Sequence, residues 1–423
     1  IFGRLKNLPL TFLGGIAIGL AVSYWNWVSG TGRKWPWLSE LRATIPILIL
    51  FAILIVLPQE RLRGAAIKKH REVFKTPSMK SSIIWGITFV VIVSGLTPML
   101  ETKWEFSLSK GIGFSIIALS MVLLTGYAGE INLAPLAFAG IGALSAYQFD
   151  VGSTVETGAG FATLATALSL FFAFLVLSAF GFKRRKLWIL SFSIALLTLL
   201  LVTIFDGTTG TGIASRESMS VSALLVATLI SGISGALVAL PALRLRGLYL
   251  GLATFAFAIF VDKMVYKQRQ TLSLDIPFIG DGEDITFNIF NNGALNMPRP
   301  EFLSINFKNN QSAMLILLAI CFTLIALLLV HLKRSSYGRQ LSAMKDSPAA
   351  SATLGLNMLR LKLSVFTLAA AIAGFGGALH ASNLRAIQED APFTVFEGLG
   401  LFMLTVVGGI GYVSGALIGG ILY

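Results

Sequence analysis

Charged residues are scarce in this 423-residue chain, at 13%, whereas hydrophobic residues make up 55% and the mean hydropathy is +0.79. A soluble domain does not bury so large an apolar share, so the composition predicts a polytopic membrane protein. Cysteine occurs once, at Cys321 inside an apolar run. A single cysteine excludes a disulfide framework, and we expect Cys321 to be a small core residue.

Chemistry-bearing motifs are also missing. The three histidines, His70, His331 and His380, form no metal-ligand spacing with cysteines or carboxylates, and no nucleophile–base pair stands out. These absences disfavour a membrane-embedded enzyme. The sequence also has no G-x-x-x-x-G-K-[ST] loop, so it cannot bind ATP in the P-loop manner. An energised transporter built from this chain would need a separate ATPase.

Apolar runs near the ~20 residues that cross a bilayer predict transmembrane helices. They lie at 8–28, 41–57, 83–100, 112–127, 161–182, 187–205, 219–240, 248–262, 312–332 and 363–381. Two further apolar stretches, 129–149 and 394–423, are rich in Gly, Ala or Pro and predict broken or re-entrant helices. We therefore expect an all-α transmembrane bundle of roughly 10–12 spans.

The net charge of +13 has its simplest explanation in membrane topology rather than in nucleic-acid binding, because the basic residues fall in loops. Lys and Arg gather at 61–80, 183–186, 244–246 and 333–345, whereas the loops 150–160 and 206–218 are nearly free of them. The basic loops are therefore expected on the cytoplasmic side. The long loop 263–311 is then expected outside.

The charged stretch 58–82 follows two apolar runs and is longer than a helix anchor requires. It predicts a junction, with one membrane unit at 1–63, a basic cytoplasmic linker at 64–82 and a second unit at 83–423. A long cytoplasmic loop within one unit is the alternative. The chain begins without Met and stops inside an apolar run, so we expect it to be part of something longer, with the second unit cut short.

A polar, basic stretch at 337–363 separates two strongly apolar runs and is far longer than a simple turn. It carries Ala349, Ala350 and Ala352 on a helix-forming segment, then Gly355 as a helix C-cap. This pattern predicts a short helix at the cytoplasmic surface that another protein grips.

The most unusual intramembrane stretch is LTGYAGEINLAPLAFAGIGALSAY, residues 124–147. Gly129 lets backbones approach closely, while Asn132 and Pro135 interrupt helical hydrogen bonding. Glu130 has no basic neighbour in sequence, and a carboxylate at membrane depth costs roughly 2.5–3.5 kcal/mol. Glu130 is therefore expected to face water, a partner or the translocation pathway. The alternative is a solvated, structural carboxylate at the cytoplasmic end of the break.

Two other segments carry weaker signals. In 241–260, Pro241 ends one apolar run and Gly247 starts the next, which fits a tight inside loop or a helix that borders the pathway. The segment TVVGGIGYVSGALIGG, 405–420, has more glycine than a lipid-facing helix, since each costs up to ~1 kcal/mol relative to Ala. Close helix packing is the first explanation and a broken helix the second.

Together these segments resemble the permeases of branched-chain amino-acid ABC importers, specifically the LivM-type subunit. The collinear matching stretches are 123–147, 240–258, 337–381 and 396–420. The resemblance implies that 346–355 forms the helix that docks on the ATPase. It places the coupling loop at Gly338, Arg339, Asp346, Ala349, Ala350 and Gly355. This chain has Pro348 where the family often has an acidic residue, and Pro suits a first helical position.

The resemblance also implies partners: two ATPase subunits that carry ATP and Mg, an extracytoplasmic binding protein and a second permease unit, in a bacterial cytoplasmic membrane. No cofactor is expected on this chain itself. The implied substrate is a small branched-chain amino acid, with urea or short amides as the alternative. Residues 1–63 resemble the tail of the companion LivH-type permease, which would make the chain a fused pair. An ion-coupled carrier, using Glu130 and Asp262, stays open as a function of another class.

Overall fold

The computed structural model describes most of the chain from residue 77 onward. The described residues are 16, 19–21, 23–24, 77–150, 169–174, 176–177, 184–206, 218–242, 245, 247–263, 272–274, 285–287, 294–302, 305–307, 310–388 and 393–423. The predicted spans at 8–28, 41–57 and 161–182, the linker 64–82 and much of the loop 263–311 lie wholly or largely outside them.

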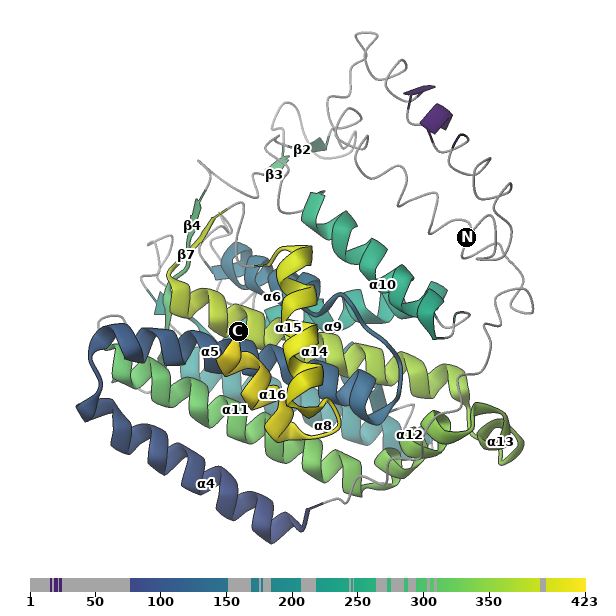
Figure 1. The fold of residues 1–423 in the computed structure, drawn as a ribbon, viewed down its shortest axis with the longest axis horizontal. Coiled ribbons are helices and arrows are strands. Elements are labelled where there is room, and N and C mark those ends of the chain that lie inside the picture. The colour runs from purple at the N-terminus through teal and green to yellow at the C-terminus, as the bar shows by residue number, and fades with distance from the viewer. Residues whose placement is uncertain are drawn as a thin grey trace.

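Helices dominate the described residues (Figure 1). They are α4 (Met79–Leu96), α5 (Thr102–Met121), α6 (Pro135–Asp150), α8 (Arg184–Asp206), α9 (Val221–Ala242), α10 (Leu248–Val261), α11 (Gln311–Arg334), α12 (Ser336–Asp346), α13 (Pro348–Thr353), α14 (Met358–Leu384), α15 (Val395–Gly409) and α16 (Val413–Leu422). A 3-10 turn, η3 (Thr97–Met99), follows α4, and a π-helical turn, η4 (Val122–Tyr127), continues α5.

Within the described residues, five helical segments are long and apolar enough to cross a membrane. These segments contain α4, α5 with η4, α9, α11 and α14, and shorter apolar helices accompany them. The prediction of an all-α polytopic bundle is confirmed. One boundary differs clearly: α5 begins at Thr102 rather than near 112. Glu105 of its first turn is buried and accepts a 2.5 Å hydrogen bond from Ser312 of α11, which satisfies this charged end of the helix.

The core is built from α5, α6, α9 and α14, and the backbones of these helices pack closely against one another. A Cβ atom at Gly142 of α6 would lie 2.4 Å from the Cα atom of Gly374 in α14. Ser231 of α9 packs at the same point. Its hydroxyl lies 2.9 Å from the carbonyl of Phe138 in α6 and 2.8 Å from that of Ala370 in α14. Glycine is needed here because three backbones approach one point.

The glycine-rich end of the chain forms a helical hairpin, so both explanations of its composition hold. α15 ends at Gly409, whose φ is +103°, and α16 begins at Val413. A Cβ atom at Gly415 would lie 2.1 Å from the carbonyl oxygen of Gly409, and one at Gly420 would lie 2.3 Å from the backbone of Ser115 in α5. Close packing and an interrupted helix therefore occur together.

Short strands cover one end of the bundle. β5 (Arg299–Phe302) pairs in parallel with β1 (Ser218–Met219) and antiparallel with β6 (Ile305–Asn306). Two antiparallel pairs complete the set: β2 (Leu272–Leu274) with β3 (Ile285–Phe287), and β4 (Ala294–Asn296) with β7 (Ala386–Gln388). These strands lie on the side predicted to be outside, and α12 and α13 lie at the opposite end of the long helices (Figure 1).

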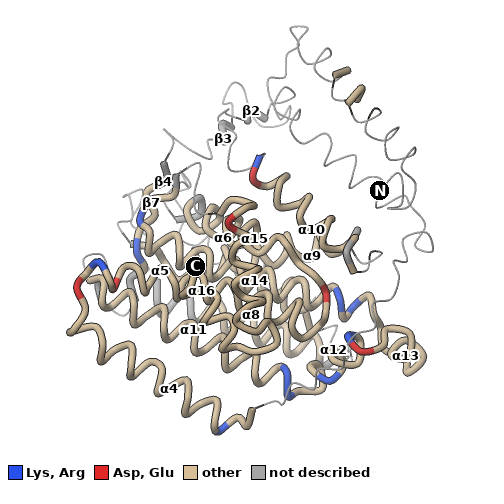
Figure 2. The backbone as a smooth tube through the Cα atoms, in the orientation of Figure 1, with Lys and Arg blue, Asp and Glu red and all other residues tan. Residues whose placement is uncertain are grey.

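The charged residues support the expected orientation. Lys and Arg gather at the end of the bundle where α11 meets α12, and the membrane-crossing middle is almost free of charge (Figure 2). Arg334, at the end of α11, donates a 2.9 Å hydrogen bond to the carbonyl of Pro77, just before α4. Two of the predicted cytoplasmic segments therefore lie side by side.

Candidate functional site

The predicted docking segment forms α13, a short helix with a defined start and end. The Ser347 side chain accepts a hydrogen bond from the Ala350 amide at 3.3 Å, and Pro348 occupies the first helical position. At the other end Gly355 adopts a φ of +83°. The amides of Gly355 and Leu356 then bond back to the carbonyls of Ala352 and Ser351, which is the Schellman arrangement.

α13 presents most of its surface to solvent. Ala349 and Ala350 are exposed, whereas Ser351 is buried against the protein, and the side chain of Leu354 after the helix is 80% exposed. The single helix expected over 346–355 is divided, because the chain is extended at Ser347. Asp346 is therefore the last residue of α12 rather than the first of α13.

α12 fixes α13 to the membrane helices. Gly338 lies at the tight turn from α11, where a Cβ atom would lie 2.2 Å from the carbonyl oxygen of Lys333. The buried Tyr337 hydroxyl is 2.6 Å from that of Ser364 in α14. Burial raises the pKa of Tyr337 well above its ordinary value, so the phenol stays protonated in this contact. Arg339 is exposed and donates to the carbonyl of Arg334 at 3.4 Å.

The predicted intramembrane break runs from the last two residues of η4 to the start of α6, and we call residues 126–134 the break. Gly129 has a φ of +73°, which favours glycine. Asn132 is buried, and its side-chain oxygen accepts a 3.0 Å hydrogen bond from the Ala134 amide. Pro135 then starts α6, so the local backbone is satisfied by an Asx turn rather than by helix continuity.

A neighbouring helix supplies one more hydrogen-bond partner to the break. The amide of Leu133 donates a 3.0 Å hydrogen bond to the hydroxyl of Thr254 in α10. Gly251, one turn earlier, brings α10 close, because a Cβ atom there would lie 3.1 Å from the Ile131 side chain. The region expected either to border the pathway or to be a tight loop thus packs directly on the break.

Glu130 forms a buried ion pair. Its carboxylate lies 2.6 Å from the amino group of Lys362 in the first turns of α14, and the two side chains are 12% and 10% exposed. The carboxylate is therefore neither solvated nor unpaired, because the fold supplies a cation from 232 positions along the chain, the difference between 362 and 130.

A second lysine, which precedes α13 in the sequence, binds the same segment of backbone. Lys345 of α12 donates a 2.8 Å hydrogen bond to the carbonyl of Gly126. A Cβ atom at Gly129 would lie 2.7 Å from the Lys345 side chain, so only glycine leaves room for this contact. The turn between α15 and α16 also touches the break, since a Cβ atom at Gly126 would lie 2.2 Å from the carbonyl oxygen of Ile410.

The structure therefore brings the two predicted sites together. α13 lies between Lys345 and Lys362, and both lysines hold the break at 126–130. The helices before and after α13, α12 and α14, therefore both contact the break. Among the described residues, no group of three His, Cys, Asp or Glu side chains is placed to hold a metal ion.

Residues 104–423 match the family model described as "Branched-chain amino acid transport system / permease component". The chain belongs to this family. It is also 27% identical to the high-affinity branched-chain amino acid transport system permease protein LivM of Escherichia coli over 221 residues, which are 47% of this chain and 48% of that protein. The LivM protein of Salmonella typhimurium is 27% identical over 210 residues, 44% of this chain and 45% of that protein.

A third relative is the permease protein BraD of Pseudomonas aeruginosa, 25% identical over 187 residues, 40% of this chain and 59% of that protein. The chain thus spans about half the length of the curated LivM relatives that it matches. No solved structure matches it at a significant level. The family membership and the apolar helices confirm the predictions of a transport permease component and of a multi-pass membrane protein.

Three contacts of this permease could not be read from its sequence. Lys345 and Lys362 look like ordinary basic residues at a cytoplasmic surface, and Thr254 looks like a helix-lining residue. A weak signal existed for Lys362, because it lies between the apolar residues Leu361 and Leu363 at the start of a predicted span. A lysine at such a position often needs an acidic partner, but nothing in the sequence identifies Glu130 as that partner.

Proposed function

We propose that the chain is the permease unit of an ATP-driven importer of branched-chain amino acids, and that separate ATPase subunits drive it through α13. The family match and the relatives' names support the substrate class. The observation that carries the coupling role is the placement of α13, exposed to solvent and bracketed by two lysines that hold the buried break.

In the proposed mechanism α13 acts as a lever, a rigid helix that transmits movement of the ATPase to the membrane helices. α13 is fixed at its start by Ser347 and at its end by Gly355, so a force on its exposed face passes to α12 and α14 rather than unwinding the helix. Lys345 and Lys362 transmit that force to the break. Helices with two discrete packings can then expose a pathway beside the break alternately to the two sides.

The proposed complex contains further components. Two ATPase subunits would supply ATP and Mg, because this sequence has no P-loop. An extracytoplasmic binding protein would deliver the substrate, and a second permease unit would complete the pathway. Residues 1–63 are proposed to belong to such a unit within the same chain, with 64–82 as the linker to 83–423.

Two alternative functions make different demands on this site, one in its chemistry and one only in its substrate. An ion-coupled carrier needs an acid that binds and releases a cation, but Glu130 is held by Lys362 at 2.6 Å, and Asp262 lies 3.7 Å from Lys263 at the end of α10. Import of urea or short amides would use the same lever, and competition in an uptake assay separates these substrates from amino acids.

The test uses the transporter purified from the membrane with its partners and placed in liposomes. Glu at both Ala349 and Ala350 keeps a good helix former on α13 but adds bulk and charge to its exposed face. We expect this variant to reach the membrane normally but to lose substrate-stimulated ATP hydrolysis and leucine uptake. Ser342→Glu, on an exposed position of α12, is the matched control. Full hydrolysis in the double variant would overturn the docking role.

A further inference from the structure

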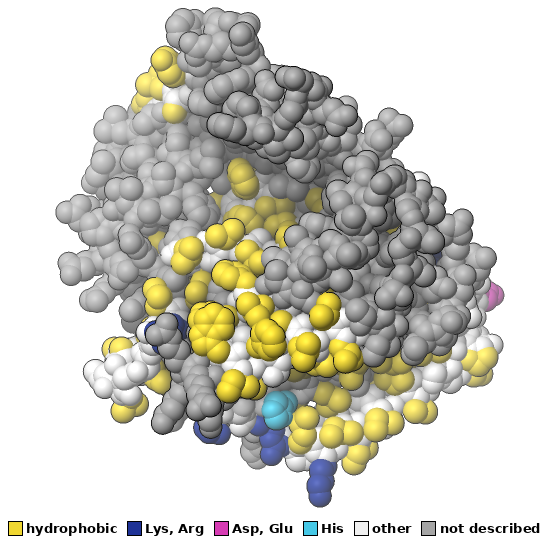
Figure 3. All heavy atoms as spheres, turned by 180° about the vertical axis from the view of Figure 1, so that it is seen from behind, with side chains coloured by type: hydrophobic (Ala, Val, Ile, Leu, Met, Phe, Trp, Pro, Cys, Tyr) yellow, Lys and Arg dark blue, Asp and Glu magenta, His cyan; other side chains and the backbone are white. Residues whose placement is uncertain are grey.

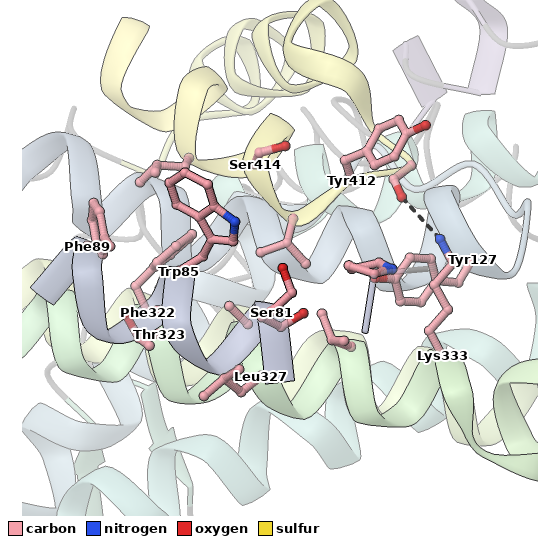
Figure 4. Close-up of a pocket in the computed structure, with 18 residues that line it drawn as sticks. Ser81, Trp85, Phe89, Tyr127, Phe322, Thr323, Leu327, Lys333, Tyr412 and Ser414 are labelled. Carbon is pink, nitrogen blue, oxygen red and sulfur yellow. Dashed lines mark hydrogen bonds between the residues drawn. The ribbon is translucent and has the colours of Figure 1, made fainter. Parts of the chain in front are cut away.

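A cavity of about 430 Å³ lies between α4, α11 and α16, and Tyr127 at the start of the break lines one end of it (Figure 4). Its volume falls in the ~300–1,000 Å³ range of small-molecule sites and far exceeds the ~30 Å³ that one water molecule occupies. α4 packs on α11 through Gly86, where a Cβ atom would lie 2.6 Å from Thr323. Phe89 and Phe322, with ring centroids 5.7 Å apart, lie side by side on its wall.

The cavity is apolar along most of its length. Its walls include Trp85, Phe322, Leu327, Val330 and Leu417. Trp85 is 71% exposed in the described protein, on the outward side of a helix that is apolar enough to cross the membrane. Hydrophobic side chains also gather on the described part of the opposite face of the molecule, so lipid contact is expected around the bundle (Figure 3). We therefore expect lipid chains at the opening of the cavity.

One end of the cavity is polar and basic. Lys333 points into this end, where its amino group lies 4.6 Å from the ring centroid of Tyr127 and 3.5 Å from the carbonyl oxygen of Gly411 (Figure 4). The hydroxyls of Ser81, Ser82 and Ser414 line the same cavity. Two exposed cations, Lys80 and Arg334, are sequence neighbours of residues that line the cavity. This end lies at the cytoplasmic surface by the charge distribution described above.

An apolar groove with cations and hydroxyls at its cytoplasmic mouth is complementary in shape and charge to a membrane lipid with an anionic head group. We infer that the cavity binds one anionic glycerophospholipid, with an acyl chain between α4 and α16 and its phosphate beside Lys333. The acyl chain gains little by leaving other lipid tails, so the head group supplies the selectivity. The inference goes beyond the proposed transport function and holds whatever solute the permease carries.

The test is native mass spectrometry of the detergent-purified transporter, titrated with phosphatidylglycerol and with phosphatidylcholine of the same acyl chains. We expect one phosphatidylglycerol to bind more tightly than any phosphatidylcholine. Lys333→Gln should weaken this binding about fivefold, since each cation near the head group contributes on that scale. Lys103→Gln, an exposed cation at the opposite end of the bundle, should not.

A second pair of variants tests the place rather than the charge. Ser414→Trp fills the cavity from an exposed position of α16, whereas Ile418→Trp, one turn later, adds the same ring outside the lining residues. We expect the first to abolish the tight site and the second to keep it, with unchanged thermal unfolding in lipid-free detergent for both. Equal binding of the two lipids, or equal binding by the two Trp variants, would overturn the inference. So would crosslinking of Trp85→Cys to another protein subunit by a bifunctional thiol reagent.

Discussion

The ion pair between Glu130 and Lys362 gives the sharpest stability prediction. Its atoms are 2.6 Å apart and both side chains are about nine-tenths buried. Glu130→Gln leaves the charged amino group of Lys362 buried without a counterion. Lys362→Met leaves the charged carboxylate of Glu130 buried without a counterion. Breaking a buried pair from one side costs about 3–5 kcal/mol. Changing both residues removes both charges, so the double variant should be far more stable than the sum of the single effects predicts.

The assay is the unfolding of the detergent-purified transporter by heat or denaturant, followed for the wild type, both single variants and the double variant. We expect each single variant to unfold at a clearly lower temperature or denaturant concentration, and the double variant to recover most of the loss. Uptake should stay low in the double variant, because the link from α14 to the break is gone. Additive losses in the double variant, or wild-type stability in either single variant, would refute the pairing.

Two further predictions use glycine pairs. Gly129→Ala should reduce coupled transport and stability more than Gly247→Ala, because both residues have positive φ, but only the new Cβ at 129 meets Lys345, at 2.7 Å; equal effects in uptake and thermal unfolding would argue against the Lys345 contact. Gly142→Ala should destabilise the bundle, since its Cβ would meet the α14 backbone, whereas Gly95→Ala in α4 has nothing within 4 Å and should gain up to ~1 kcal/mol of helix stability. Similar unfolding temperatures for these two would contradict the close packing of α6 on α14.

Much of the fold follows from local signals in the sequence. Apolar length predicts α11 and α14, Pro348 and Gly355 predict the two ends of α13, and Pro135 predicts the break before α6. Each of these signals depends on a few consecutive residues and on backbone chemistry. Local reasoning therefore suffices for them.

The rest depends on contacts between distant segments. The charged start of α5 reads as a loop in the sequence, yet Ser312 of α11 satisfies Glu105 and the helix extends. The partner of Glu130 is equally hidden, since Lys362 becomes a buried ion only when α14 packs beside the break. The resemblance implies a docking role for 346–355 but does not say how that segment contacts the membrane helices. The contacts of Lys345 with Gly126 and of Lys362 with Glu130 appear only in the structure.

The central claim is that ATP-driven movement of α13 reaches the break. The only cysteine in the chain, Cys321, is replaced by serine, and a new cysteine is placed at the half-buried Leu133. Its labelling by a small thiol reagent is measured in the assembled transporter, first without nucleotide and then trapped with ATP and vanadate. We expect different labelling rates in the two states, and no difference in the variant that carries both Ala349→Glu and Ala350→Glu. Equal rates in the two states of a transporter that still imports its substrate would contradict it.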